Sequence, residues 1–157
     1  MQDQSSEKHD SKARLVRRWI EEGWNKGHTG IASEIFAPDY VQHEAVTPHM
    51  NIGIERIKGN INTYRRAFPD LHTTILEQFS SGDRVATRWR ADGTHKGELF
   101  GLAPTGRAMS VEGMVISRVE HGRIVEEWDL LDNLGLLTQL GAIEQDVARR
   151  VAGSEMN

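Results

Sequence analysis

Arg123-Ile-Val-Glu-Glu-Trp-Asp-Leu-Leu-Asp132, entered through the turn Glu120-His-Gly122, is the stretch that decides the fold. Its β-branched and aromatic residues predict a strand, in which side chains alternate between two faces. Glu127, Asp129 and Leu131 share one face, and the other carries Glu126, Trp128, Leu130 and Asp132. Because a strand with acids on both faces cannot bury both, we expect one face to line a cavity that holds Asp129.

Two helices are predicted near the start of the chain. The first is capped at Asp10 or Ser11, after a polar and frayed opening, and it ends between Gly23 and Gly30. Its apolar stripe consists of Leu15, Val16, Trp19 and Ile20. The second helix covers residues 31–36 and is closed by Pro38. Residues 39–44 then run extended, and a loop follows to about Asn51.

A third helix has the clearest pattern in the sequence. Its apolar residues recur at spacings of three and four before Pro69 stops it. They are Ile54, Ile57, Ile61, Tyr64 and Phe68. Such a stripe must pack on a flat apolar surface, and the second half of the chain is expected to supply it. Neighbouring Arg65 and Arg66 are expected to lie in solvent.

Four strands are predicted at residues 71–79, 84–94, 107–119 and 123–132, with a glycine-bearing loop at 97–106. The turns Ser81-Gly-Asp83 and Glu120-His-Gly122 are short enough for hairpins, so these neighbours should be antiparallel. A short helix at residues 134–140 closes the order. Helices followed by a strand meander predict an α+β fold. We expect a curved antiparallel sheet wrapped around three N-terminal helices, with an internal pocket at its open end.

Length and composition predict one domain. The chain has 157 residues, of which 38% are hydrophobic and 27% charged, enough for one compact core. We expect a polar N-terminal extension at 1–10, a single domain at 11–141 and a polar tail at 142–157. A net charge of −4 without a Lys/Arg run argues against nucleic-acid or membrane binding. The absence of cysteine and of long apolar runs leads us to expect a cytoplasmic protein.

Six short motifs, in this order and spacing, resemble one known family. They are Phe68-Pro-Asp70, Ser81-Gly-Asp-Arg-Val85, Gly93-Thr-His-Lys-Gly97, Gly101-Leu-Ala-Pro-Thr-Gly-Arg107, Gly122-Arg-Ile-Val-Glu-Glu-Trp-Asp129 and Gln139-Leu-Gly141. The chain is similar to the SnoaL-like polyketide cyclases, also called ester cyclases. The resemblance implies an NTF2-like α+β cone, the fold also used by ketosteroid isomerases and limonene epoxide hydrolases.

The resemblance also implies an activity. Characterised members close the fourth ring of anthracycline precursors by intramolecular aldol condensation, and their acid/base Asp falls on Asp129. They carry a His where this chain has Glu127, and a Gln-x-His pair where it has Gly113 and Val115. We expect a cofactor-free, metal-free cyclase or isomerase of a small hydrophobic carbonyl compound, with Asp129 as acid/base. Glu127, roughly 6.5–7 Å along the strand, is expected to raise the pKa of Asp129.

Further residues are expected to bind the substrate. Tyr40, Gln42 and His43 would reach the pocket mouth, and Trp89, Val115 and Leu131 would form its wall. Glu112 should point away from the pocket, and His72 and His95 are expected to be structural. Met114 and Ile116 alternate onto the opposite face, where an apolar patch predicts a homodimer or larger assembly.

Three other motifs are incomplete in this sequence. His43-Glu44 with His49 lacks the spacing of a zinc-binding helix, and Gly101 to Ala108 lacks the Lys and hydroxyl of a phosphate loop. No Gly-x-Ser-x-Gly motif is present. Two alternatives stay open: a non-catalytic small-molecule-binding domain, whose acids would be tied up in ion pairs, and an epoxide hydrolase. The latter needs Arg88 or Arg90 to point inward.

Overall fold

The computed structural model describes residues 4–45, 53–144, 147 and 153, with side chains from residue 11 onward. The elements are α1 (Gln4–Arg18), η1 (Trp19–Asn25), η2 (Thr29–Ile31), α2 (Ala32–Ile35), β1 (Phe36–Glu44), α3 (Ile54–Ala67), β2 (His72–Ser81), β3 (Arg84–Thr94), β4 (Ala108–Glu120), β5 (Arg123–Leu131) and α4 (Asn133–Gln139). The expected loop to Asn51, with His49, and most of the expected tail lie outside the described residues.

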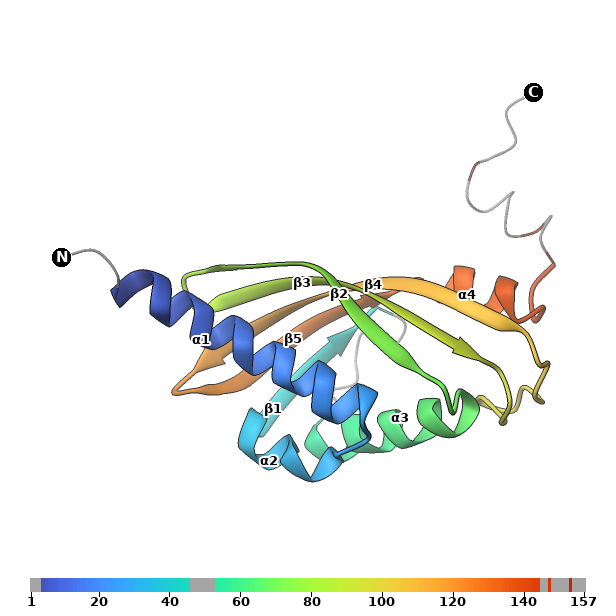
Figure 1. Cartoon of the computed structure of the whole chain (residues 1–157), viewed down its shortest axis with the longest axis horizontal. Helices are drawn as coiled ribbons and strands as arrows, with labels where there is room; N and C mark the ends of the chain where they lie inside the picture. Colours follow the sequence, from blue (N-terminus) through green and yellow to red (C-terminus); the bar gives the residue numbers. More distant parts are fainter. Residues whose placement is uncertain (1–3, 46–52, 145–146, 148–152, 154–157) are drawn as a thin grey trace.

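The four strands β2 to β5 form the antiparallel meander that the sequence predicts. Two tight turns connect β2 to β3 and β4 to β5, with Gly82 at φ 58° and Gly122 at φ 74°. A positive φ at these positions suits glycine, which has no Cβ to clash. Figure 1 shows the strands as one curved layer, with α1, α2 and α3 together on one side of it.

The sheet contains a fifth strand, β1, which makes it a mixed sheet. The predicted sheet was purely antiparallel and did not include this strand. β1 pairs in parallel with β5, so the sheet order is β1-β5-β4-β3-β2. Residues 39–44 were expected to be extended, but no local pattern indicated their partner. The register aligns Gln42 with Glu127 and Glu44 with Asp129. This pairing brings the segment after α2 beside the two acids of β5.

The N-terminal helix begins earlier than predicted. It begins at Gln4, so the expected start at Asp10 or Ser11 is wrong, while its last turn, the π-helical η1, ends at Asn25, within the predicted range of Gly23 to Gly30. Val16, Trp19 and Ile20 of the predicted stripe are buried. The Trp19 ring packs so closely on Gly23 that an added Cβ would lie 2.6 Å from it. Gly23 therefore serves packing here and does not end the helix.

The side chain of Arg65 joins α3 to η1, so the expectation that it lies in solvent is wrong. Its Nη1 donates to the backbone oxygens of Trp24, at 2.8 Å, and Asn25, at 2.6 Å. These carbonyls end η1 and need donors from outside the helix.

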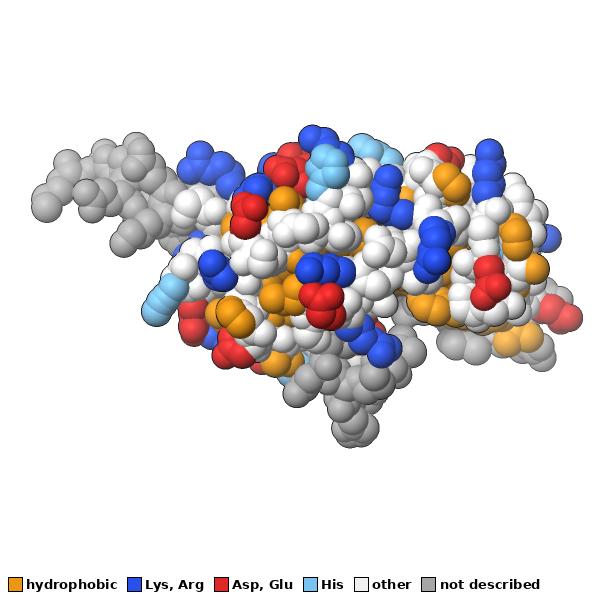
Figure 2. All heavy atoms as spheres, turned by 90° about the horizontal axis from the view of Figure 1, so that it is seen from below, with side chains coloured by type: hydrophobic (Ala, Val, Ile, Leu, Met, Phe, Trp, Pro, Cys, Tyr) orange, Lys and Arg blue, Asp and Glu red, His pale blue; other side chains and the backbone are white. Residues whose placement is uncertain are grey.

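Elsewhere on the helix-covered side, basic and acidic side chains are interspersed (Figure 2). No helix in the described part of the chain is long and apolar enough to cross a membrane.

The core consists of two apolar clusters at opposite ends of the sheet's inner face. One includes Val85, Val119 and Ile124, packed under α1, η1 and α3. The other includes Ala91 and Val111, with residues that precede β2 and follow β5. Along each inner strand face, the residues between these clusters are more polar. The fold therefore places a polar band across the middle of its own interior.

Candidate active site

Glu127 lies in this polar band with both carboxylate oxygens engaged. The Tyr40 hydroxyl donates to Oε2 at 2.7 Å, and Ser117 Oγ donates to Oε1 at 2.6 Å. The side chain is fully enclosed, at 4% exposure. Burial raises the pKa of Glu127, and the hydrogen bonds from Ser117 and Tyr40 oppose that rise. Glu127 is thus a fixed part of the interior, held from β1 and β4.

Asp129 is two residues further along the same face and has very different surroundings. Its Oδ1 is buried and makes no hydrogen bond within the described residues. Its Oδ2 lies 3.5 Å from the amide nitrogen of Gln42, at the limit for a hydrogen bond. Burial raises the pKa of Asp129 to about 7, and the negative charges of Glu127 and Glu44 add to the rise, while the Leu130 backbone opposes it. This carboxyl therefore exchanges its proton near neutral pH.

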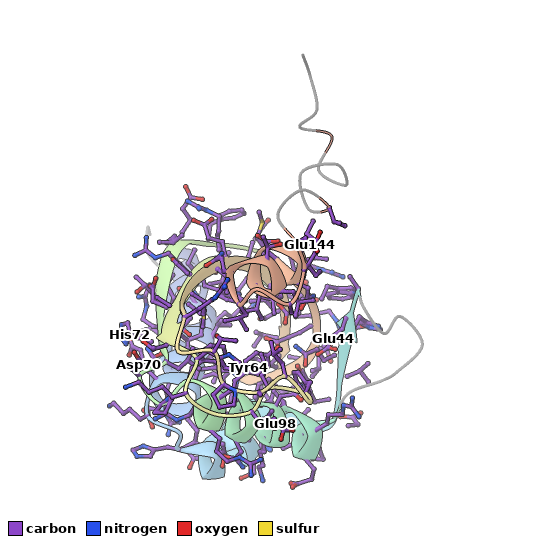
Figure 3. All side chains as sticks on the ribbon, turned by 90° about the vertical axis from the view of Figure 1, so that its right-hand side faces the viewer. Glu44, Tyr64, Asp70, His72, Glu98 and Glu144 are labelled. Atoms are coloured by element: carbon purple, nitrogen blue, oxygen red, sulfur yellow. The ribbon has the colours of Figure 1, made fainter. Side chains whose placement is uncertain are left out.

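Tyr64 approaches the same group from α3. Burial raises the pKa of Tyr64 to about 12, and the charges of Glu44 and Asp129 contribute. The end-on view labels Tyr64 on α3 and Glu44 on the neighbouring edge strand β1 (Figure 3). A phenol therefore joins the carboxyls on this side of the polar band.

Trp89 and Gly113 form the next row of the inner face. They are cross-strand partners, and Gly113 pairs in turn with Leu131. The indole lies over the glycine, where an added Cβ would meet it at 2.3 Å. Trp89 and Leu131 are partly buried and pack against the second apolar cluster. Any larger side chain at position 113 has no room while Trp89 holds this place.

The predicted site residues on β1 divide between the two faces. Tyr40 and Gln42 point inward and are buried. His43 was expected at the pocket mouth, and this expectation is wrong because strand alternation turns it to the outer face. There its ring stacks on Trp128 at 5.4 Å, and its Nε2 lies 2.9 Å from Glu126 Oε1.

The two arginines that an epoxide hydrolase would need also point outward. Arg88 pairs with Glu77 and Glu112, and Arg90 pairs with Asp92. All of these side chains lie on the outer side of β2, β3 and β4, where Glu112 was expected. The inward Asp-Arg-Asp cluster of that alternative is therefore not formed.

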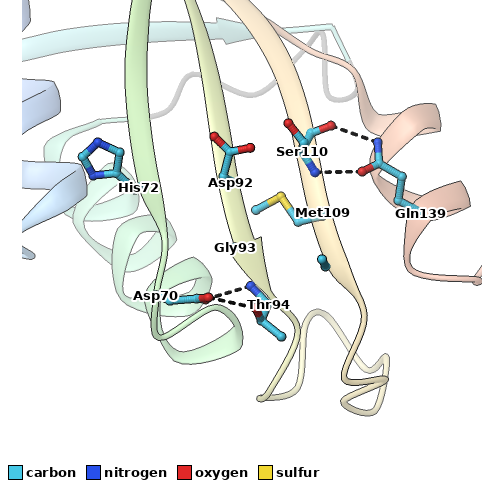
Figure 4. Close-up of a pocket in the computed structure, with 9 residues that line it drawn as sticks. Asp70, His72, Asp92, Gly93, Thr94, Met109, Ser110 and Gln139 are labelled. Carbon is cyan, nitrogen blue, oxygen red and sulfur yellow. Dashed lines mark hydrogen bonds between the residues drawn. The ribbon is translucent and has the colours of Figure 1, made fainter.

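An open groove of about 450 Å³ lies away from Asp129. It runs over the outer face of β3 and β4 toward α4 (Figure 4). Asp70 in this groove accepts hydrogen bonds from the backbone and hydroxyl of Thr94. The Gln139 side chain likewise accepts a hydrogen bond from the backbone N–H of Ser110 and donates one to its backbone oxygen. Because these groups already have protein partners, we place the candidate site at Asp129; a pocket there stays a prediction.

Three residues of the site were missed in the sequence. Ser117 and Glu44 follow from alternation, since they continue the inward faces that carry Val115 and Gln42. Val115 itself is the cross-strand partner of Asp129, and its place in a pocket wall stays a prediction. Tyr64 gave no separate signal because it belongs to the apolar stripe of α3. Among the described residues, no group of three or more His, Asp or Glu is arranged to hold a metal ion.

Comparison with known proteins identifies the family. Residues 14–140 match the SnoaL-like polyketide cyclase family. The chain belongs to this family. It is 30% identical to aklanonic acid methyl ester cyclase DnrD of Streptomyces peucetius, over 81% of this chain and 88% of that protein. The curated relatives are enzymes named as cyclases, so a cyclase-like enzymatic activity is supported.

Solved structures agree with this assignment. IdmH of Streptomyces antibioticus, a proposed polyketide cyclase, is 35% identical with a TM-score of 0.74, covering 83% of this chain and 98% of IdmH. AclR of Streptomyces galilaeus, a proposed hydroxylase, is 27% identical with a TM-score of 0.76, covering 86% and 98%. The expected NTF2-like α+β fold is confirmed.

Proposed function

We propose that this SnoaL-like protein closes a ring in a hydrophobic polyketide-type carbonyl compound by an intramolecular aldol reaction, with Asp129 as acid and base. The observation that carries the proposal is the buried Oδ1 of Asp129, which has no hydrogen-bond partner in the described structure. A buried carboxyl without a hydrogen-bond partner lowers the stability of the fold. Groups of this kind cluster at functional sites, where they take part in the chemistry.

One carboxyl suffices for both proton transfers. Asp129 as carboxylate takes a proton from the carbon next to a carbonyl, and the resulting enolate carbon attacks a second carbonyl of the same molecule. A C–C bond forms, and the new alkoxide takes the proton back from Asp129. Nothing is oxidised or reduced, so this route requires no redox cofactor. A pKa of about 7 keeps both protonation states populated at neutral pH.

The alternative of a non-catalytic binding domain predicts that the interior acids are tied up. Glu127 is held in this way, but by Tyr40 and Ser117 and not in an ion pair. Asp129 has no comparable partners. This difference between the two acids favours an enzymatic function over a non-catalytic binding domain.

Aklanonic acid methyl ester, the compound in the name of DnrD, is the first substrate to test. Ring closure by wild type and by Asp129→Asn is monitored by chromatography. The product is an isomer of the substrate, so mass spectrometry should give it an unchanged mass. We expect Asp129→Asn to lower kcat by about 10²–10⁴-fold, the usual contribution of positioned proton transfer. Retention of full activity in Asp129→Asn would exclude it as the acid/base.

We also propose that the outer sheet face pairs with a second copy of the chain. Met114, Ile116 and Leu130 are 58%, 42% and 60% exposed, and the register of β4 and β5 makes them neighbours. Such a contiguous apolar patch favours association. Light scattering should give a dimer or larger for wild type at micromolar concentration, and Met114→Lys should shift it toward monomer. A monomeric wild type would refute this proposal.

A further inference from the structure

The two tyrosines of the chain have opposite situations. Tyr40 is 3% exposed, and its hydroxyl is committed to Glu127. Tyr64 is only partly buried, and its hydroxyl makes no hydrogen bond with any described residue. Of these two phenols, Tyr64 is the one whose donor has no partner among the described residues.

The ring of Tyr64 is fixed by aromatic contacts, although its hydroxyl has no hydrogen-bond partner in the described part of the chain. It meets Trp24 edge-on at 6.1 Å and Phe100 edge-on at 5.8 Å. It also packs against the apolar cluster that Trp89 and Leu131 border. Aromatic contacts of this kind orient a ring without using its polar atom. The hydroxyl is therefore held in place beside an interior wall of apolar side chains.

The surroundings of this hydroxyl connect it to the proposed reaction. Glu44 and Asp129 are the charged groups that act on Tyr64, and no base is bonded to it to take its proton. Since the pKa of Tyr64 is raised to about 12, the phenol stays protonated at neutral pH and remains a donor. A phenol O–H within the electrostatic reach of a carboxyl base is suited to bind the oxygen of a carbonyl whose neighbouring carbon meets that base.

We infer that Tyr64 is a second catalytic residue, whose hydroxyl hydrogen-bonds to the substrate carbonyl oxygen while Asp129 removes the adjacent proton. This inference rests on the proposed function of Asp129. In the enolisation step the proton moves from carbon to Asp129, and negative charge moves from the carboxylate to the carbonyl oxygen. The Tyr64 O–H stabilises that charge and keeps its own proton. When the new C–C bond forms, the charge leaves this oxygen for the attacked carbonyl.

The matched test removes one oxygen atom. Tyr64→Phe keeps both ring contacts, so its thermal midpoint should equal that of wild type. With aklanonic acid methyl ester, we expect kcat to fall by about 10²-fold, the usual cost of removing one oxyanion donor, and KM to change much less. The acid limb of the pH profile should stay near the value of wild type, because Asp129 is unaltered. In D₂O, deuterium incorporation next to the substrate carbonyl should slow by the same factor.

Three variants separate the possible results. If Asp129→Asn loses turnover and Tyr64→Phe keeps kcat within about twofold, the role of Tyr64 is refuted and the proposed function stands. If Asp129→Asn keeps full turnover, the proposed function fails first. Tyr40→Phe removes the same atom from the other tyrosine and is expected to shift the pH profile without the 10²-fold loss at the optimum. An equal loss at the optimum in both Tyr variants would also refute a specific donor role for Tyr64.

Discussion

Glu127 and Asp129 lie on one face of β5, yet their environments differ in kind. Glu127 accepts hydrogen bonds from Tyr40 and Ser117 and belongs to the interior beside the first apolar cluster. Asp129 has one weak side-chain contact, with Gln42, and a buried oxygen without a partner among the described residues. Desolvation raises the pKa of both carboxyls, but only at Glu127 do side-chain hydrogen bonds oppose the rise.

The difference shows how one strand divides structural and chemical work between two acids. A buried carboxyl with satisfied oxygens is expensive to remove, because its partners then lose their acceptor. A buried carboxyl without partners is expensive to keep charged. Removing each acid should therefore change stability in opposite directions.

The largest effect is expected at Glu127. Glu127→Ala leaves the hydroxyls of Tyr40 and Ser117 buried without an acceptor and opens a cavity, so unfolding free energy should fall by about 4–5 kcal/mol. Urea unfolding measures this loss. Glu126→Ala, one residue earlier on the outer face, is the control and should cost about 1 kcal/mol, since its partners Arg118 and His43 remain in contact with water. Equal losses in both variants would contradict a structural role specific to Glu127.

Asp129→Asn should instead stabilise the protein at alkaline pH. The folded pKa of about 7 exceeds the ordinary value of 3.8, so the folded state binds this proton more tightly than the unfolded state does. Stability of wild type therefore falls as pH rises from about 4 to 7, by up to about 4 kcal/mol. The asparagine does not titrate, so its advantage should be small at pH 4 and greatest above pH 7.

Thermal unfolding of both proteins across pH 4–8 measures this difference. Glu144→Gln, which changes an exposed acid, is the control and should follow the wild-type curve. Parallel curves for wild type and Asp129→Asn would mean that Asp129 titrates at an ordinary pKa, and the comparison with Glu127 would collapse.

Tyr40→Phe tests whether the protonation of Glu127 affects the pKa of Asp129. Without the Tyr40 hydrogen bond, the pKa of Glu127 rises further, so Glu127 is neutral over a wider pH range. Its repulsion of Asp129 then weakens, and the pKa of Asp129 falls. The acid limb of the kcat/KM profile should move to lower pH by less than about one unit. A shift to higher pH would show that Glu127 does not act on Asp129 through its charge.

The smallest effect is expected for His43→Gln. His43 faces outward and contacts Trp128 and Glu126, not the interior. The variant should keep kcat/KM within about twofold of wild type, measured on the same ester. A loss of 10-fold or more would place His43 back in the site that the sequence predicted for it.

Local patterns predicted most of the fold. Two-residue alternation and turn glycines give β2 to β5, and the spacing of Ile57 and Ile61 gives α3, because these features depend on near neighbours in the chain. The pairing of β1 with β5 joins distant segments and leaves no local pattern. The first helix ends within its predicted range, at Asn25, but the close packing of Trp19 on Gly23 leaves no local pattern in the sequence.

The site was predictable where alternation was applied and was missed where it was not. Asp129 and Glu127 were found from one strand face. Gln42 and His43 were both assigned to the pocket, although adjacent strand residues cannot share a face, and the structure turns His43 outward. Tyr64 needed the packing of α3 against the sheet, which no sequence spacing reveals.

The parallel pairing of β1 and β5 also sets when the site can form during synthesis. Tyr40 and Glu127 are 87 positions apart, so their contact cannot exist until nearly the whole domain has left the ribosome. Contacts at such separation carry a high loop-closure cost and slow folding. Until β5 arrives, the edge of β1 and the hydroxyl of Tyr40 have no native partner, and the nascent chain exposes a strand edge open to association. The site around Glu127 and Asp129 therefore forms late, in the same step that pairs β5 with β1.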